Sequence, residues 1–200
     1  MTAPAPTLAA NLLIMALSSE SDGVFEAAGV PVIYSGVGKV NAAVVLMEQL
    51  ERYRRAGIAP VRVVNFGSAG SRQFPAGTLV GCSRFVQRDM DVRALGFALG
   101  QTPFEPTPVV LDFAPVFTSL PDAQCGSGDS FSTGADALPS DVVDMEAYAL
   151  AKVCYRAGLR FACAKYVTDG ADHAAADAWR DNVHKAAQRF LALYRRLGTD

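Results

Sequence analysis

Apolar runs recur along the chain, and each one ends in small or polar residues. Runs of this kind are typical of strands that are buried on both faces of a parallel sheet. They cover residues 11–17, 30–34, 61–66, 80–86 and 161–167. Helical spacing of apolar residues predicts helices at about 41–55, after 146 and at 179–197. This alternation predicts an α/β fold, with a central mixed, mostly parallel sheet flanked by helices in a single domain.

Two of the predicted helices have a clear apolar face. The helix after residue 146 can bury Ala147, Leu150, Ala151, Val153 and Cys154 on one side. The closing helix can bury Val183, Ala187, Phe190, Leu191 and Tyr194. By contrast, residues 106–118 hold short apolar pieces broken by proline and leave no room for a long helix.

Composition sets the bounds on this fold. With 200 residues, half of them hydrophobic, the chain can form one globular domain, which we expect at 11–200. Residues 1–10 are rich in Ala, Pro and Thr and are expected to be a flexible N-terminal tail. No apolar run reaches transmembrane length, so no membrane partner is expected. The net charge of −2 and the lack of a basic run argue against a nucleic-acid partner.

The cysteines and histidines restrict the possible chemistry. The four cysteines (Cys82, Cys125, Cys154, Cys163) are far apart in sequence and are expected to be small buried residues in a reducing cytoplasm, not metal ligands. Only two histidines exist, His173 and His184, so a Ser-His-Asp or Cys-His enzyme is disfavoured. Any catalysis is therefore expected to depend on carboxylates.

Acidic or hydroxyl side chains follow several of the predicted strands. They are Glu20, Ser68, Asp129 and Asp169. Ligands of open α/β sheets bind at the carboxyl ends of strands, so these residues form a site hypothesis. For Glu20 alone, a helix cap or a solvated loop explains the sequence slightly better.

Asp144, Met145 and Glu146 precede a helix in an unusual combination. The Met145 thioether offers an apolar surface, and a carboxylate can accept hydrogen bonds from two hydroxyl groups. This combination suits a sugar with vicinal hydroxyls. The alternative is that the carboxylates merely stabilise the positive end of the helix dipole. Phe131 follows a Gly-containing turn and can stack on a flat base, although a core position is the more common explanation. The Gly-rich turn at 35–41 can bind phosphate, but tight packing explains its glycines equally well.

Several of these segments occur together in the order of a known family. They are residues 34–43 (YSGVGKVNAA), 65–70 (NFGSAG), 127–131 (SGDSF), 144–147 (DMEA) and 168–169 (TD), with 88–92 and 95–101 extending the match. The chain resembles the nucleoside phosphorylase and nucleosidase superfamily, specifically the 5'-methylthioadenosine/S-adenosylhomocysteine nucleosidases. The resemblance covers nearly the whole chain after residue 11.

The resemblance implies roles for the groups that carry out the reaction. Asp169 matches the acid that protonates or hydrogen-bonds purine N7, and Glu20 matches the residue that orients and deprotonates water. Ser68 lies where the family has a hydroxyl near the water and the ribose. Lys165 stands where an Arg usually supports the water site. Enzymes that hydrolyse O-glycosides also use two carboxyl groups, one as the acid and the other as the base.

The resemblance also implies how the substrate is bound. Met145 and Glu146 match the ribose-binding pair, with Glu146 accepting the 2'- and 3'-hydroxyls. Phe131 matches the ring that stacks on adenine. The Ser132 backbone and Thr168 fall in segments that contact the base.

The function implied by the resemblance is hydrolysis of the N-glycosidic bond of a purine nucleoside, most simply 5'-methylthioadenosine or S-adenosylhomocysteine. No metal or organic cofactor is expected, because water is the second substrate. The family is usually a cytoplasmic homodimer, and residues 89–104 are the expected partner-facing loop. The chain is short for the family, which leaves three alternatives: another purine nucleoside hydrolase such as a futalosine hydrolase, a nucleoside phosphorylase, or a non-catalytic nucleoside-binding protein. A flavodoxin-like binding module shares the sheet but does not require Asp144–Glu146 and Asp169 together.

Phosphorolysis is disfavoured by the charges in the motifs. A phosphate nucleophile needs Arg, Lys or clustered backbone N–H donors. Asn65 is neutral where related phosphorylases have an Arg, and Glu20 stands in place of a phosphate-binding loop. Lys39 and Lys165 are the remaining candidates for binding an anion, and a single lysine replaces an Arg cluster poorly.

Overall fold

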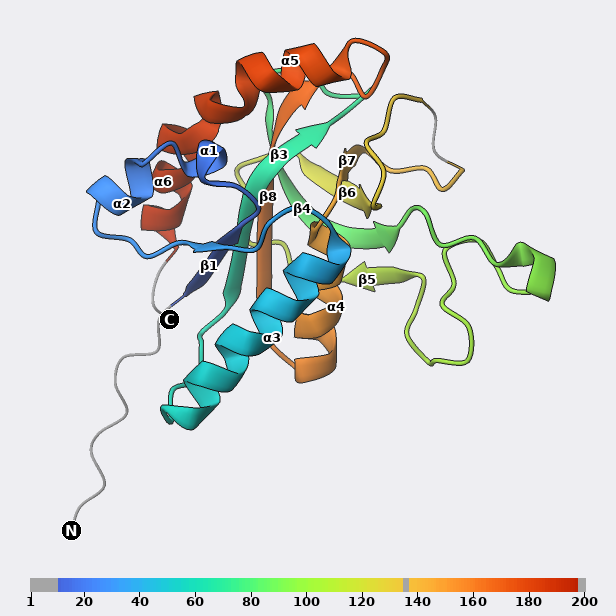
Figure 1. The fold of residues 1–200 in the computed structure, drawn as a ribbon, viewed down its shortest axis with the longest axis horizontal. Helices are drawn as coiled ribbons and strands as arrows, with labels where there is room; N and C mark the ends of the chain where they lie inside the picture. Colours follow the sequence, from blue (N-terminus) through green and yellow to red (C-terminus); the bar gives the residue numbers. More distant parts are fainter. Residues whose placement is uncertain (1–10, 135–136, 198–200) are drawn as a thin grey trace.

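The computed structural model describes residues 11–134 and 137–197, so the tail predicted at 1–10 lies outside the described residues. It confirms the α/β fold (Figure 1). Of the eight strand pairings, five are parallel, so the sheet is mixed and mostly parallel as predicted. The strands are β1 (Leu12–Met15), β2 (Ile33–Tyr34), β3 (Val63–Gly70), β4 (Leu79–Gln87), β5 (Val110–Asp112), β6 (Asp122–Ser127), β7 (Val142–Asp144) and β8 (Phe161–Asp169).

Five of these strands close on one another. β3 pairs with β8, β8 with β4, β4 with β6 and β6 with β7, and β7 returns to β3 through Gly70 and Val143. Gly70 is required at this closure, because a Cβ there would lie 2.6 Å from the Oδ1 atom of Asp169. The ring therefore brings the ends of β3 and β8 next to the segment that leads into Asp144.

The strands are buried on both faces, which explains their continuous apolar sequences. In β1, Leu12 and Ile14 belong to one core cluster, whereas Leu13 and Met15 belong to the other. The same alternation occurs in β8. Side chains of a strand point alternately to the two faces of the sheet. When both faces are covered, consecutive residues must therefore all be apolar.

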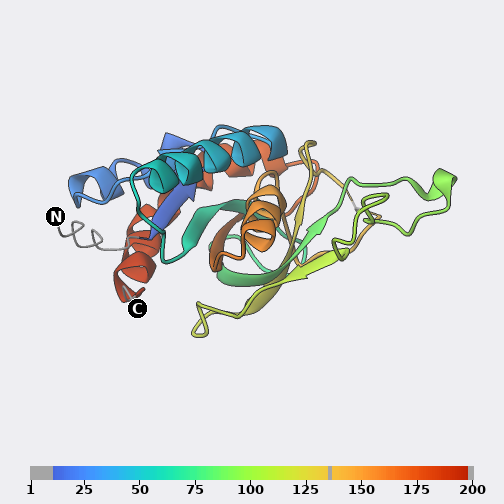
Figure 2. The ribbon, with the colours of Figure 1, turned by 90° about the horizontal axis from the view of Figure 1, so that it is seen from below.

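The helices divide between the two cores. α3 (Lys39–Arg55) and α4 (Ala147–Ala157) pack against each other and contribute to the first core (Figures 1 and 2). α2 (Val24–Ala27) and α6 (Ala187–Arg196) contact each other and contribute to the second. The predicted inner face of α4 is buried, except that Val153 is half-buried. The single turn α1 (Ser18–Ser21) follows β1 directly.

The prediction of one closing helix at 179–197 is wrong. The chain instead forms α5 (Ala175–Asn182), a 3-10 turn η2 (Val183–Ala186) and α6. In Figure 1, α5 crosses the top of the molecule and α6 runs down its side. α5 buries only Ala175, whereas α6 packs Phe190 and Leu191 into the core. One straight helix could not both cross the top of the molecule, as α5 does, and pack along its side, as α6 does (Figure 1). The expected inner face is nevertheless buried at Val183, Ala187, Phe190 and Leu191.

Residues 89–104 extend away from the sheet, with one 3-10 turn, η1 (Arg93–Leu95) (Figures 1 and 2). Phe104 is 93% exposed, and its ring contacts that of Phe97 at a centroid distance of 5.1 Å. Between residues 106 and 118 the structure shows the short strand β5 and no helix, as predicted.

The four cysteines are buried free thiols. Within residues 11–134 and 137–197, no helix combines the length and the apolar character needed to span a membrane. In the same part of the chain, no group of three or more His, Cys, Asp or Glu side chains is arranged to hold a metal ion.

Candidate active site

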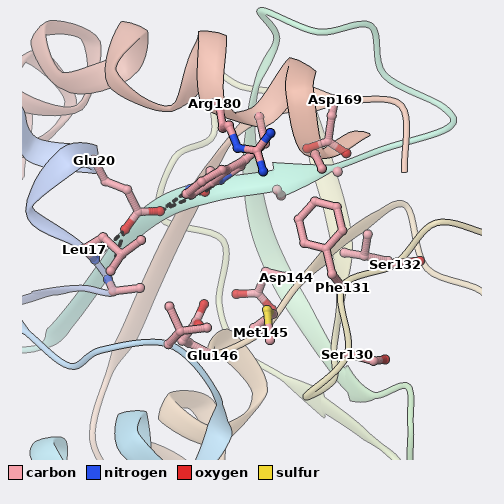
Figure 3. A pocket seen from close by; sticks show the side chains of 18 of the residues that line it. Leu17, Glu20, Ser130, Phe131, Ser132, Asp144, Met145, Glu146, Asp169 and Arg180 are labelled. Carbon is pink, nitrogen blue, oxygen red and sulfur yellow. Dashed lines mark hydrogen bonds between the residues drawn. The ribbon is translucent and has the colours of Figure 1, made fainter. Parts of the chain in front are cut away.

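A cavity of about 300 Å³ opens between α5, the start of α4, the end of β1 and the loop at 130–132 (Figure 3). Its size is at the lower end of the range for small-molecule sites, about 300–1,000 Å³. Seven of the nine predicted site residues line it: Glu20, Ser68, Phe131, Ser132, Met145, Glu146 and Asp169. Lys165 and Thr168 lie behind its wall, and Asp129 lies to one side.

Glu20 is fixed by four hydrogen bonds and is only 3% exposed. The backbone N–H groups of Ala16 and Leu17 donate to its Oε2 atom, both at 3.1 Å. Ser68 donates to its Oε1 atom twice, from the backbone N–H at 2.7 Å and from the hydroxyl at 2.9 Å. A carboxylate offers about four acceptor positions, so Glu20 is held in one orientation.

Trp179, the only tryptophan of the chain, also belongs to this wall of the cavity. Its indole N–H donates to the Ser68 hydroxyl at 3.0 Å. A chain of hydrogen bonds therefore runs from Trp179 through Ser68 to Glu20. From the sequence, Trp179 is predicted only to begin a helix. Its distance of 111 residues from Ser68 explains why sequence spacing did not reveal the contact.

Asp169 ends β8 and is 4% exposed. Its Oδ1 atom accepts the backbone N–H of Ala171 at 3.0 Å, and its Oδ2 atom accepts the Thr168 hydroxyl at 2.7 Å. Thr168 is fully buried, so its side chain orients Asp169 and does not face the cavity.

Met145 and Glu146 enter the cavity from the start of α4 (Figure 3). Glu146 is 8% exposed, and its Oε1 atom accepts the backbone N–H of Gly38 at 2.8 Å. Burial, and then the neighbouring charge of Asp144, raise the pKa of Glu146 to about 8.

Asp144 does not behave as a second sugar ligand, because it forms a buried ion pair. Its Oδ2 atom lies 2.7 Å from the Nζ atom of Lys165, and both side chains are almost fully buried. Burial alone would raise the pKa of Asp144, but the charge of Lys165 and hydrogen bonds from Lys165, Ser127 and the Ala147 N–H lower it. Burial likewise opposes the charge of Lys165, and Asp144 raises the pKa of the lysine well above its ordinary value.

Lys165 lies directly beneath the wall that holds Glu20. A Cβ atom at Gly67 would be 3.1 Å from the Oε1 atom of Glu20 and 3.2 Å from the Nζ atom of Lys165. The absence of a side chain at Gly67 therefore lets the buried cation approach this carboxylate.

The loop that carries Phe131 and Ser132 forms one wall of the cavity. Phe131 is 46% exposed, so it is a cavity residue and not a core residue. Arg88 anchors the loop, because its guanidinium donates to the backbone carbonyl of Ser130. Gly128 is needed for this contact, since a Cβ there would lie 2.9 Å from the Cζ atom of Arg88.

In the Gly-rich turn before α3, carboxylates occupy two backbone donors, those of Gly38 and Lys39. Glu146 accepts the Gly38 N–H, and Asp129 accepts the Lys39 N–H at 2.8 Å. The Lys39 ammonium pairs with Asp89 at 2.5 Å and lies 3.6 Å from Asp129. This explains why Asp129, although predicted among the strand-end residues, does not line the cavity.

The chain as a whole is similar to known proteins. The sequence profile described as "Phosphorylase superfamily" matches residues 23–120 and 128–197. A 5'-methylthioadenosine/S-adenosylhomocysteine nucleosidase of Marinomonas sp. (strain MWYL1) is 30% identical over 190 residues, which cover 83% of this chain and 79% of the relative. The enzyme of the same name from Anoxybacillus flavithermus is 31% identical over 82% of this chain and 78% of its own length.

Solved structures show the same fold. The 5'-methylthioadenosine/S-adenosylhomocysteine nucleosidase of Helicobacter pylori, in complex with a substituted pyrrolidin-3-ol, superimposes with a TM-score of 0.81 at 19% identity, covering 95% of this chain and 99% of that structure. The futalosine hydrolase of Helicobacter pylori also has a TM-score of 0.81, at 20% identity, covering 94% of this chain and 97% of its own.

Proposed function

Because this chain belongs to the phosphorylase superfamily and, within it, to the 5'-methylthioadenosine/S-adenosylhomocysteine nucleosidase family, we propose that it hydrolyses the N-glycosidic bond of a purine nucleoside. The proposed substrate is 5'-methylthioadenosine or S-adenosylhomocysteine. The observation that carries this proposal is the convergence of Glu20, Glu146 and Asp169 on one cavity of suitable size. These residues come from distant segments of the chain.

The proposed base site lies between Phe131 and Asp169. Departure of a purine leaves negative charge on the base, so a proton or hydrogen bond at N7 lowers the barrier. Asp169 is the proposed donor, and the Thr168 hydroxyl holds its carboxyl group in place. The Phe131 ring stacks on the base, while the Ser132 segment contacts its edge.

The proposed sugar site is formed by Met145 and Glu146. The thioether covers the ring, and the carboxyl group receives the two vicinal hydroxyls. Before substrate binds, the raised pKa of Glu146 favours its protonated form near neutral pH. Two hydroxyl donors favour the carboxylate, so substrate binding is expected to ionise Glu146.

Glu20 is the proposed base for water. Three of its four donors are backbone N–H groups with fixed directions, whereas the Ser68 hydroxyl can rotate. The nucleophilic water is therefore proposed to take the place of the Ser68 hydroxyl at Oε1. Trp179 and Lys165 support this arrangement from its two sides.

Water, and not phosphate, is the proposed nucleophile. Phosphate needs free backbone donors or cations. Here, carboxylates occupy the N–H groups of Gly38 and Lys39, and the two candidate lysines, Lys39 and Lys165, are paired with Asp89 and Asp144. Bringing a dianion to Glu20 would also place like charges together.

Product analysis tests this proposal. We expect free adenine and the free thio-sugar from 5'-methylthioadenosine in phosphate-free buffer, and no sugar 1-phosphate after phosphate is added. Chromatography of the products distinguishes the two reactions. A strict requirement for phosphate, or sugar 1-phosphate as the main product, would contradict hydrolysis while leaving the fold unaffected.

The proposed assembly is a homodimer in the cytoplasm. α3 exposes an apolar row of Val40, Val44 and Met47, and residues 89–104 expose Leu95 and Phe104. An exposed row of this kind suits a twofold contact between copies of the chain. The free thiols suit a reducing compartment. Sedimentation at micromolar concentration is expected to show two chains, and a fully active monomer would contradict the dimer.

A further inference from the structure

One face of α5 forms a wall of the cavity, and only Trp179 on that face has a part in the proposed reaction. Ala176, Trp179 and Arg180 all line the cavity, and their spacing places them on the same side of the helix. Trp179 contacts Ser68, but Arg180 has no assigned role. In Figure 3 the Arg180 side chain descends from α5, on the opposite side of the view from Met145 and Glu146.

Arg180 differs from the other charged residues that line the cavity. Four of them are acidic: Glu20, Asp144, Glu146 and Asp169. The second basic residue, Arg88, is 6% exposed and donates to the Ser130 carbonyl, so it fixes the position of the loop that carries Phe131. The Arg180 guanidinium instead pairs with Asp177 at 2.7 Å, and both side chains are largely in solvent, at 68% and 86% exposure.

The stereochemistry of a nucleoside places its 5'-substituent near this wall. In a β-ribonucleoside, C5' is on the face of the sugar opposite to the 2'- and 3'-hydroxyls. If Glu146 receives those hydroxyls, the 5'-substituent projects away from Glu146, and Arg180 of α5 lies across the cavity from that residue (Figure 3). Trp179 then offers an apolar surface for a thioether, and the next residue, Arg180, lines the same cavity with a largely exposed side chain.

We infer that Arg180 forms a subsite for a carboxylate at the end of the 5'-substituent. This inference rests on the proposed function and refines its substrate class, because S-adenosylhomocysteine carries such a carboxylate and 5'-methylthioadenosine does not. A guanidinium presents paired N–H donors that match a carboxylate. The exposed i,i+3 pair with Asp177 is weak, so a substrate carboxylate can replace it.

Two matched adenosine 5'-thioethers test the subsite, one ending in a carboxylate and one in the corresponding carboxamide. We expect kcat/KM to favour the carboxylate about fivefold at low salt, the range of a solvent-exposed ion pair, and less at high salt. Arg180→Gln is expected to bring the ratio close to one. Asp177→Asn is the matched control, because it removes a competing carboxylate from the same helix, and it is expected to keep or increase the preference.

Calorimetry on the same samples measures the binding of both compounds. This measurement tests the Arg180 subsite separately from the proposed hydrolysis. If neither compound is cleaved but the carboxylate binds better and Arg180→Gln removes that difference, hydrolysis is contradicted and the subsite is supported. If the wild-type protein does not discriminate between the compounds, or if Arg180→Gln retains the preference, the subsite is contradicted, whether or not hydrolysis occurs.

Discussion

Glu20 and Glu146 are buried glutamates that face the same cavity from different segments, but their surroundings differ. Glu20 follows β1 and accepts four hydrogen bonds, two from Ala16 and Leu17 and two from Ser68. Glu146 precedes α4 and accepts one from Gly38 among the described residues, with Asp144 close by. Similar burial therefore produces a fixed carboxylate in one segment and a carboxyl group with a pKa of about 8 in the other.

This difference matches two tasks. A group that positions water must keep its orientation throughout the reaction, and multiple donors provide this. A group that receives substrate hydroxyls needs vacant acceptor positions until the substrate arrives. The comparison also shows why identical residue types do not have interchangeable roles, since the number of nearby donors is set by the fold.

The largest effect is expected from the fixed carboxylate. Glu20→Gln replaces one acceptor oxygen by an NH₂ group among N–H donors, and it removes the proposed base. We expect single-turnover cleavage to fall by about 10⁴, the upper end of the range for general base catalysis. Nucleoside affinity is expected to change far less, so crystals of this variant soaked with substrate should retain the intact nucleoside.

Glu48→Gln is the matched control, because Glu48 is exposed on α3 and lies outside the cavity. It is expected to retain normal cleavage. Rapid cleavage by Glu20→Gln would show that another group activates water. The difference between Glu20 and Glu146 would then not correspond to two roles in catalysis.

Asp169 extends the comparison to the base end of the cavity. Asp169→Asn keeps the shape but removes the proton, so we expect turnover of the purine substrate to fall by about 10²–10³. A riboside with a p-nitrophenolate leaving group needs no proton at departure. The loss is therefore expected to shrink to less than about tenfold for that substrate, in steady-state assays run side by side. Equal losses on both substrates would argue against an acid role.

The smallest effect is a pH-dependent stability difference at Glu146. Its pKa is raised from 4.5 to about 8 in the folded protein, so the folded state retains a proton that the unfolded state loses. Stability from this source is present below about pH 4.5 and is lost as the pH rises toward 8. Glu146→Gln removes the titration. We therefore expect the wild-type protein to lose on the order of 2 kcal/mol relative to the variant between about pH 6 and pH 8.

Urea unfolding at the two pH values measures this difference, with Glu48→Gln as a control that should follow the wild type. Parallel pH profiles for wild type and Glu146→Gln would mean that Glu146 is ionised in the folded protein, and the contrast with Glu20 would then be one of geometry alone.

The local pattern of the sequence was enough to predict the strands β1, β2, β3, β4 and β8 and the helices α3 and α4. Both faces of the strands are covered, so their apolar runs were visible without any knowledge of their partners. The closing helix was mispredicted because its apolar face continues through residues 183–187, although the backbone changes direction there. Periodicity reports which side chains are buried, and it does not report where a helix axis bends.

The sequence by itself determined which chemical groups are present and the order in which they occur. It contained Glu20, Ser68, Asp144–Glu146 and Asp169 at positions where strands end or helices begin, because those signals depend on neighbouring residues. Only the tertiary structure decided their partners. Asp144 is committed to Lys165, Glu146 receives the Gly38 N–H from 108 residues away, and Trp179 reaches Ser68. Closure of β3, β8, β4, β6 and β7 on one another brings Asp144 and Lys165 together, and the packing of α3 and α5 around the sheet supplies the other two contacts. A hydrogen bond depends on the final positions of two groups and not on their separation along the chain.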